Sequence, residues 1–231
     1  MKEYSAIIPV YNEVSRVSDV LSAVLRCSEI SEIICVDDGS DDGSYELIRD
    51  NFSSITLIKH DNNKGKSETI FTGLKMVKND SILLIDSDLV NLKSKEISEA
   101  IKLFEKNNLD CLLLSTTAWS FIDTLFRFLF IVPLKMAGNR IIKRNDLLDI
   151  FEKRKPNGYQ LEIAQNIYFL NNTKKVARLD ISAVNVWKLH KRGLIHGTIS
   201  DFKMWQGIVK YAGWKMFLKQ TYSFAKNKVY F

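Results

Sequence analysis

Residues 4–13 read YSAIIPVYNE, an apolar run that ends in a short polar cluster. The same arrangement recurs at residues 32–38 (EIICVDD) and 81–88 (SILLIDSD). Short apolar runs bounded by polar residues are typical of strands buried on both faces of a parallel sheet. Stretches with helical spacing separate them, as in residues 15–25, where apolar side chains stand at 17, 20, 21, 24 and 25. The pattern predicts an α/β fold with a mostly parallel central sheet flanked by helices.

The polar clusters at the ends of these runs are the first candidates for a functional site. The carboxyl ends of parallel strands lie along one edge of a sheet, and open α/β folds bind ligands there. Asp86 and Asp88 follow an apolar run and are one residue apart, so both carboxylates can reach a single divalent cation. Oxygen ligands suit Mg²⁺ or Mn²⁺. Such a cation would neutralise a diphosphate and stabilise the charge that grows on it as a leaving group.

Two further segments bear on nucleotide binding. Asp37 and Asp38 follow a predicted strand, where they serve a turn or accept a hydrogen bond from a nucleobase or ribose. Lys64-Gly-Lys66 precedes a predicted helix and would bring cations and backbone N–H groups near phosphates. The G-x-x-x-x-G-K spacing is absent, and no G-x-G-x-x-G follows the first strand. A Walker A loop and a dinucleotide Rossmann site are therefore disfavoured.

The composition is that of a folded globular protein. The chain has 231 residues, of which 46% are hydrophobic and 26% charged, and this balance excludes a disordered or collagen-like chain. It has three cysteines and no C-x-x-C pair, so we expect reduced buried thiols in place of a disulfide framework or a cysteine zinc site. Without an apolar leader or a run of about 18 apolar residues, we expect neither a signal peptide nor a transmembrane helix.

The net charge of +6 is concentrated at the C-terminus. Residues 200–231 contain six lysines and one acid, Asp201, which leaves this tail at +5. Aromatic residues alternate with the lysines, as in an interfacial helix on an anionic membrane, although a solvated helix face gives the same pattern. Segment 119–134 is apolar nearly all round, which fits a core helix or an interfacial one. We expect a cytoplasmic protein that attaches peripherally to the cytoplasmic membrane face, and no nucleic-acid partner.

Four motifs in order resemble the signature of family 2 glycosyltransferases with the GT-A fold, over about the first 115 residues. They are Ile8-Pro-Val-Tyr-Asn-Glu13, Val36-Asp-Asp-Gly-Ser40, Lys64-Gly-Lys-Ser-Glu68 and Ile85-Asp-Ser-Asp-Leu89. The resemblance implies a nucleotide-diphosphate sugar donor and bound Mg²⁺ or Mn²⁺. It implies that the donor contacts Pro9, Tyr11, Glu13, Asp38, Lys66, Asp86 and Ser87. It also implies that the metal is held by Asp88, together with Asp86.

The second half is similar to polyprenyl-phosphate sugar synthases and to glucosyl-3-phosphoglycerate synthases. Met136-Ala-Gly-Asn-Arg140 and Asn157-Gly-Tyr-Gln-Leu-Glu162 carry this likeness. It implies that Arg140 lies by the acceptor and Glu162 near the sugar. Val90 departs from the glutamine that lipid-phosphate enzymes often have after D-x-D-L. Where the phosphoglycerate enzymes place a metal-binding histidine on a late strand, Asn185 is the nearest oxygen-bearing substitute and our third expected metal ligand.

We therefore expect one GT-A domain over residues 1–199, with a nucleotide-sugar half (1–115) and an acceptor half (116–199), followed by a basic amphipathic tail (200–231). The expected function is metal-dependent transfer of a sugar to a phosphate-bearing acceptor, a membrane polyprenyl phosphate, with Asp88, Arg140 and Glu162 as catalytic residues. One alternative is transfer to a small soluble acceptor such as 3-phosphoglycerate. Another is a non-catalytic module that binds nucleotide sugars. His190 and His196 are expected to be structural or exposed more often than metal-binding.

Overall fold

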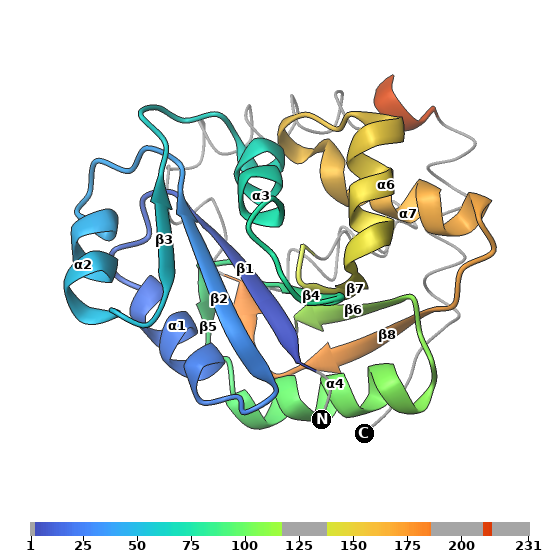
Figure 1. Cartoon of the computed structure of the whole chain (residues 1–231), viewed down its shortest axis with the longest axis horizontal. Coiled ribbons are helices and arrows are strands. Elements are labelled where there is room, and N and C mark those ends of the chain that lie inside the picture. Colours follow the sequence, from blue (N-terminus) through green and yellow to red (C-terminus); the bar gives the residue numbers. More distant parts are fainter. Residues whose placement is uncertain (1–2, 117–137, 186–209, 214–231) are drawn as a thin grey trace, which may run out of the picture.

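The computed structural model of the chain describes residues 3–116, 138–185 and 210–213 (Figure 1). Helices and strands alternate from residue 4 to residue 84, as the sequence predicts for the first half. In order they are β1 (Tyr4–Val10), α1 (Val17–Leu25), β2 (Ile30–Asp37), α2 (Ser44–Asn51), β3 (Thr56–Lys59), α3 (Lys66–Leu74), β4 (Ser81–Leu84), β5 (Leu89–Val90), α4 (Ser94–Lys106), β6 (Cys111–Thr116), β7 (Arg140–Lys143), α6 (Arg144–Arg154), the 3₁₀ turn η1 (Gly158–Gln160), α7 (Leu161–Asn171), β8 (Val176–Ile181) and β9 (Val184–Asn185).

Seven strands form one sheet in the order β3-β2-β1-β4-β7-β6-β8. Among these strands β7 is antiparallel to both of its neighbours, and the other pairings are parallel. From β1 the chain builds outward to β2 and β3 and then returns to place β4 on the other side of β1. In open α/β sheets ligands bind where the strand order reverses in this way, beyond the carboxyl ends of the strands. The fold therefore predicts a site above β1 and β4.

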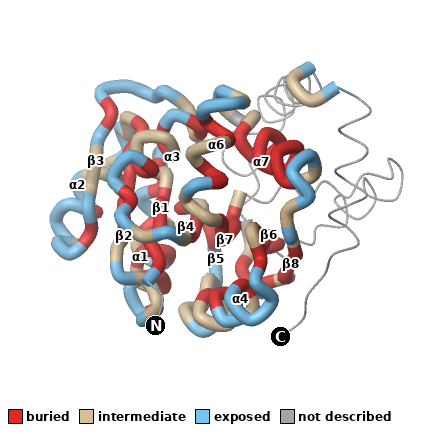
Figure 2. Tube along the Cα trace, turned by 45° about the vertical axis from the view of Figure 1, so that its right-hand side comes forward, coloured by how far each residue is buried: buried red, intermediate tan, exposed pale blue. Residues whose placement is uncertain are grey.

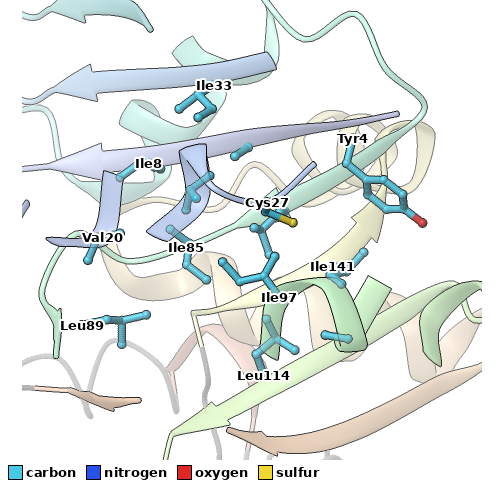
Figure 3. Packing of buried hydrophobic residues seen from close by; sticks show 14 of the residues in the cluster. Tyr4, Ile8, Val20, Cys27, Ile33, Ile85, Leu89, Ile97, Leu114 and Ile141 are labelled. Atoms are coloured by element: carbon cyan, nitrogen blue, oxygen red, sulfur yellow. The ribbon is translucent and has the colours of Figure 1, made fainter. Parts of the chain in front are cut away.

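Both faces of the sheet are covered by helices, and the side chains of β1 alternate between the two layers. Tyr4, Ala6, Ile8 and Val10 belong to a core that includes side chains of α1 and α4, whereas Ile7 belongs to a second core with α3, α6 and α7. Figure 3 shows the first of these cores, in which Ile8 and Ile85 lie near Val20 and Ile97. Burial of both faces explains why these strands are continuous apolar runs.

Pro9 stands inside β1 without breaking the sheet. Proline has no N–H to donate to a neighbouring strand. It lies two residues beyond Ile7, whose carbonyl accepts the N–H of Ile85, while β1 pairs with β4 only as far as Ile7. Its nitrogen therefore faces the side of β1 on which the partner strand has ended, and no hydrogen bond of the ladder is lost.

The structure confirms the strands expected in the first half, corrects some boundaries and adds elements that were not expected, among them the short strand β5. The helix expected over residues 15–25 begins at Val17. Helix α6 was not expected, and it separates β7 from η1. In Figure 2 α7 is mostly red, because nine of its eleven residues are buried. Segment 119–134, expected to be a core or interfacial helix, and most of the basic tail lie outside the described residues.

None of the helices in the described part of the chain is long and apolar enough to span a lipid bilayer.

Candidate functional site

The loops that follow β1 and β2 are joined to each other by hydrogen bonds. The N–H of Asn12 donates to Ser40 Oγ (3.0 Å), and Asn12 Oδ1 accepts the N–H of Asp41 (3.1 Å). The N–H of Glu13 donates to Ser44 Oγ (2.9 Å). Asn12 has φ of 56°, a left-handed conformation that asparagine tolerates better than most residues. Tyr11 and Glu13 are thus carried on a loop whose backbone is held by the segment that follows β2.

The two residues after Val36 form the second part of the site, and both are buried. Asp37 Oδ1 accepts the N–H of Ser40 (2.9 Å), and its Oδ2 has no hydrogen-bond partner. Asp38 accepts three hydrogen bonds: from the ring of His60 (2.7 Å) and the N–H of Lys64 (2.9 Å) on Oδ1, and from the N–H of Gly65 (2.8 Å) on Oδ2. These two N–H groups are therefore engaged within the protein and do not face a phosphate.

Lys66 is the centre of a cluster of charges that three separate elements bring together. It is the first residue of α3, and its Nζ lies 2.7 Å from Asp86 Oδ1, just beyond β4. The same Nζ lies 2.9 Å from Glu162 Oε1 in the first turn of α7. Burial by itself lowers the pKa of the ammonium, but the two carboxylates overcome this effect and raise the pKa above its usual value. Lys66 is therefore held as a cation at the carboxyl edge of the sheet.

Residues 138 and 139 close over this cluster. A Cβ on Gly138 would clash with Lys66 Nζ and would lie 2.8 Å from Asp86 Oδ2, so only glycine fits there in this arrangement. The next side chain, Asn139, accepts the N–H of Asp86 on its Oδ1 (2.7 Å) and is buried. The turn that carries Asp86 is thereby fixed from the start of β7. Gly138 and Asn139 had no predicted role, although both lie in the motif that ends at Arg140.

Glu162 reaches Lys66 because α3 and η1 are in contact. Ser67 Oγ donates to the carbonyl of Gly158 (2.7 Å). Asn157 and Gln160 form a capping box at the start of η1, which sets the direction in which the chain enters α7. Glu162 is buried, and its second oxygen, Oε2, has no hydrogen-bond partner.

Arg140 lies deeper than the other predicted residues. Its side chain has no exposed surface, and its Nη1 donates to Asn166 Oδ1 (3.2 Å) on α7. In β7 it stands opposite Leu84 of β4, two residues before Asp86. The structure thus brings Arg140 to the same sheet edge, inside the protein.

The three residues predicted to hold a metal lie next to the short strand β5: Asp86 and Asp88 precede it in the chain, and Asn185 pairs with it. Asp88 precedes Leu89, and Leu89 pairs with Asn185 of β9 in the antiparallel ladder. The register therefore brings the backbone of Asn185 beside the Asp86–Asp88 turn. The prediction that Asn185 is a third metal ligand needs this proximity. Within residues 3–116, 138–185 and 210–213, no three His, Cys, Asp or Glu side chains gather to form a metal site. Two carboxylates and an amide fit Mg²⁺ or Mn²⁺ that takes its other ligands from a diphosphate and water.

The other predicted donor residues lie around this edge. Tyr11 is exposed, and Pro9 is half-buried at the end of β1. Glu13 is buried and held by Arg16, whose Nη2 lies 2.8 Å from Glu13 Oε2. Ser87 is buried between the two aspartates of the turn. A cavity of about 380 Å³ elsewhere in the described chain, at the ends of α6 and α7, is lined by none of the predicted residues.

The sequence interpretation missed His60, which is buried and bonded to Asp38. A signal was present, because His60 directly follows β3, and the ends of β2 and β3 are neighbours in a parallel sheet. It also missed the cross-links from Ser40 and Ser44, whose hydroxyl groups looked like ordinary turn chemistry.

Comparison with solved structures supports the fold. Glucosyl-3-phosphoglycerate synthase from Mycobacterium tuberculosis, in complex with Mn²⁺ and UDP-glucose, matches with a TM-score of 0.71 at 17% identity and covers 92% of this chain and 79% of that one. The complex of that enzyme with Mn²⁺, UDP and phosphoglyceric acid matches with a TM-score of 0.70 at 16% identity, over 92% of this chain and 79% of that one. The fold is of the GT-A type.

The family follows from comparison with sequences. A model described as glycosyl transferase family 2 matches residues 5–166, and the chain belongs to this family. The undecaprenyl-phosphate 4-deoxy-4-formamido-L-arabinose transferase of Aeromonas hydrophila subsp. hydrophila is 38% identical over 99 residues, which are 39% of this chain and 30% of the relative. That of Edwardsiella ictaluri is 34% identical over 95 residues, 38% of this chain and 29% of the relative. The match thus spans less than a third of the length of these relatives.

Proposed function

We propose that this protein is a metal-dependent glycosyltransferase that moves a sugar from a nucleotide-diphosphate donor to a phosphate-bearing lipid. The observation that carries the proposal is the position of Lys66, 2.7 Å from Asp86 and 2.9 Å from Glu162. A lysine enclosed by carboxylates at the carboxyl edge of the sheet is a site for a charged ligand. Membership of glycosyltransferase family 2 makes a nucleotide-diphosphate sugar the fitting ligand.

On the donor side the chain supplies two hydrogen-bonded loops and the ammonium group of Lys66. The loops after β1 and β2 hold Tyr11 and Glu13 beside Asp38, where we place the nucleoside. Lys66 and the Asp86–Asp88 turn lie next along the edge, where we place the diphosphate. Because the backbone of both loops is already hydrogen-bonded, little conformational entropy is lost when the donor binds.

Asp88, Asp86 and Asn185 would hold the metal ion. When bound, Mg²⁺ or Mn²⁺ supplies positive charge that stabilises the departing diphosphate. Asp88 is the main metal ligand in this proposal, as the resemblance implies, and Asp86 is paired with Lys66 in the structure. Mn²⁺ was present in the matching complexes of glucosyl-3-phosphoglycerate synthase, which supports this choice of ion.

On the acceptor side a phosphate needs no strong general base, because it is ionised at neutral pH. We propose that Arg140 orients this phosphate by charge-assisted hydrogen bonds. Arg140 is fully buried in the structure, so this role requires its guanidinium to become accessible when the acceptor binds. Glu162 and Asp86 both bond to the Lys66 ammonium. We propose that Glu162 contacts the transferred sugar through Oε2, the oxygen that has no hydrogen-bond partner.

The lipid acceptor is supported by the curated relatives, which are named as transferases to undecaprenyl phosphate. The basic tail, residues 200–231, would attach the protein to the cytoplasmic face of the membrane as a second unit beside the GT-A domain (1–199). A small soluble acceptor is the second candidate, because the matching synthase was solved with phosphoglyceric acid.

A thermal-shift panel tests the donor and the metal together. UDP-, GDP- and dTDP-sugars are each added with and without Mn²⁺. One of them should raise the melting temperature by several degrees only when Mn²⁺ is present, because a ligand that binds the folded state stabilises it. If no nucleotide sugar shifts the melting temperature under either condition, the donor assignment is wrong.

A second experiment tests the acceptor. The donor found in the panel is incubated with Mn²⁺ and either polyprenyl phosphate in anionic vesicles or 3-phosphoglycerate. We expect a glycolipid product, and we expect removal of residues 214–231 to weaken vesicle co-sedimentation at low salt. Product with 3-phosphoglycerate alone would move the assignment to the soluble acceptor. Donor binding with neither transfer nor hydrolysis would identify a non-catalytic module.

A further inference from the structure

His60 is a buried histidine that uses both of its ring nitrogens inside the protein. Nδ1 lies 2.7 Å from Asp38 Oδ1, and Nε2 lies 3.0 Å from Thr72 Oγ1 on α3. The side chains of His60 and Asp38 are 5% and 4% exposed, so solvent does not compete for this contact. A carboxylate oxygen can only accept, so Nδ1 carries the hydrogen, and the threonine hydroxyl can donate to Nε2. His60 therefore connects the end of β2 to the side of α3.

Asp38, the partner of His60, holds the segment between β3 and α3. Besides the ring, its oxygens accept the N–H groups of Lys64 and Gly65. The neighbouring Gly39 packs so closely that an added Cβ would lie 2.8 Å from the backbone carbon of Asn62. Residues 60–65 are thus fixed at both ends against the β2 end. Loss of the His60 contact would leave Asp38 buried with one hydrogen bond fewer, so its carboxylate would be held only by the segment that it fixes.

The segment that Asp38 fixes ends one residue before Lys66. Gly65 has φ of 89°, and from there the chain enters α3 with Lys66 as its first residue. The direction in which the Lys66 side chain leaves the helix depends on how this turn is held. In the structure that direction places Nζ within hydrogen-bonding distance of both Asp86 and Glu162. A shift of about 1 Å would break at least one of these contacts.

We propose that His60 is a positioning residue of the donor site. Acting through Asp38 and Thr72, it fixes the turn into α3 and thereby holds Lys66 between Asp86 and Glu162. His60 itself touches no substrate. The proposal rests on the proposed function only in that Lys66 is taken to meet the donor diphosphate; the chain of contacts from His60 to Lys66 stands on the structure alone.

Three variants separate the two contacts of the ring. His60→Asn keeps an N–H donor near the position of Nδ1, whereas His60→Ala removes both contacts, and Thr72→Val removes only the contact to Nε2. Val24→Ala, in the core with α1 on the other face of the sheet, is the matched control for general loss of stability. Each variant is titrated with UDP, GDP and dTDP in the presence of Mn²⁺, and its melting temperature is measured in the absence of ligand.

We expect His60→Ala to weaken binding of the preferred nucleoside diphosphate at least tenfold and to raise KM for the donor more than it lowers kcat. His60→Asn should restore most of the affinity, and Thr72→Val should have an intermediate effect. Val24→Ala should lower the melting temperature and leave the affinity unchanged. Unchanged affinity in His60→Ala, or equal loss in Val24→Ala at the same melting temperature, would overturn the proposal.

A second measurement needs no ligand and therefore separates this proposal from the proposed function. The ammonium group of Lys66 is observed by ¹⁵N NMR and assigned with Lys66→Arg. In the wild-type protein two short ion pairs should slow hydrogen exchange enough to give a visible signal, which His60→Ala should abolish and His60→Asn should retain. If the wild type binds no nucleoside diphosphate, the proposed function fails, and this signal alone decides the role of His60. A signal that persists unchanged in His60→Ala contradicts that role.

Discussion

Replacement of Lys66 by methionine would leave two carboxylates facing each other without the cation between them. The lysine bonds to Asp86 at 2.7 Å and to Glu162 at 2.9 Å, and the three side chains are only 20%, 18% and 8% exposed. Removal of one partner from a buried ion pair costs about 3–5 kcal/mol, and the residual exposure places this site near the lower end, about 3 kcal/mol. For a domain of this size such a loss lowers the melting temperature by about 6–12 °C.

The pH dependence of this loss follows from the pKa values. Two carboxylates raise the pKa of Lys66 despite its burial, so its contribution to stability is complete below the unfolded value near 10.4 and declines only at higher pH. The wild-type protein therefore loses nothing from this group between about pH 5 and about pH 8. In the methionine variant the buried, unpaired carboxylates acquire raised pKa values, so the folded state takes up protons and gains stability as pH falls. The difference between the two proteins should narrow toward pH 5.

Urea denaturation followed by tryptophan fluorescence at about pH 5 and about pH 8 measures both free energies of unfolding. Lys66→Arg is the control, because it keeps the charge. A difference below about 1 kcal/mol at both pH values is the size expected of a solvated surface pair, and it would refute the buried cluster. A difference that does not change with pH would show that the carboxylates are not the cause.

Three other predictions concern the same edge and the core. Gly39→Ala should destabilise the protein by about 1–3 kcal/mol in urea denaturation, because φ is +76° and the new Cβ would meet the backbone of Asn62; a loss no larger than that of Gly43→Ala, where nothing lies within 4 Å, would contradict this. Asp88→Asn should abolish sugar transfer in a product assay and shift the melting temperature by less than about 2 °C; full activity would remove its metal role. The thiols of Cys35 and Cys111 should react with Ellman's reagent only on unfolding, because burial raises both pKa values, that of Cys111 to about 12; fast labelling of the native protein would contradict their burial.

The nucleotide half of the fold could be predicted because β1, β4 and the second half of β2 are buried on both faces, whereas the edge strand β3 is not. Such strands are short apolar runs, and a polar cluster marks the end of each. In the second half the hydrophobic pattern indicated helices and strands less clearly. Helix α6 reads RNDLLDIFEKR, in which charged residues interrupt the apolar ones and only four side chains are buried, so its helical spacing is hard to see. The reversed direction of β7 depends on its pairing with β4 and β6, which the residues of β7 alone do not encode.

For the site, the sequence indicated which residue types lie at the strand ends but not how they bond to one another. The order of motifs placed Lys66, Asp86 and Glu162 in one region, and the structure puts them in contact. Asp38 was expected to contact the nucleoside, yet its oxygens accept three hydrogen bonds from the segment after β3. The bonds from Lys64 and Gly65 depend on how that loop folds back onto β2, which no pattern in the sequence shows.

The central claim is that carboxylates from separate segments meet where a metal ion holds a sugar-bearing diphosphate. An anomalous difference map from crystals grown with Mn²⁺ and UDP tests it most directly. The account predicts one strong manganese peak at coordination distance from the Asp88 carboxylate, with the diphosphate between that peak and the Lys66 ammonium. A manganese ion and nucleotide bound away from the strand ends, with Lys66 still enclosed by Asp86 and Glu162, would contradict it.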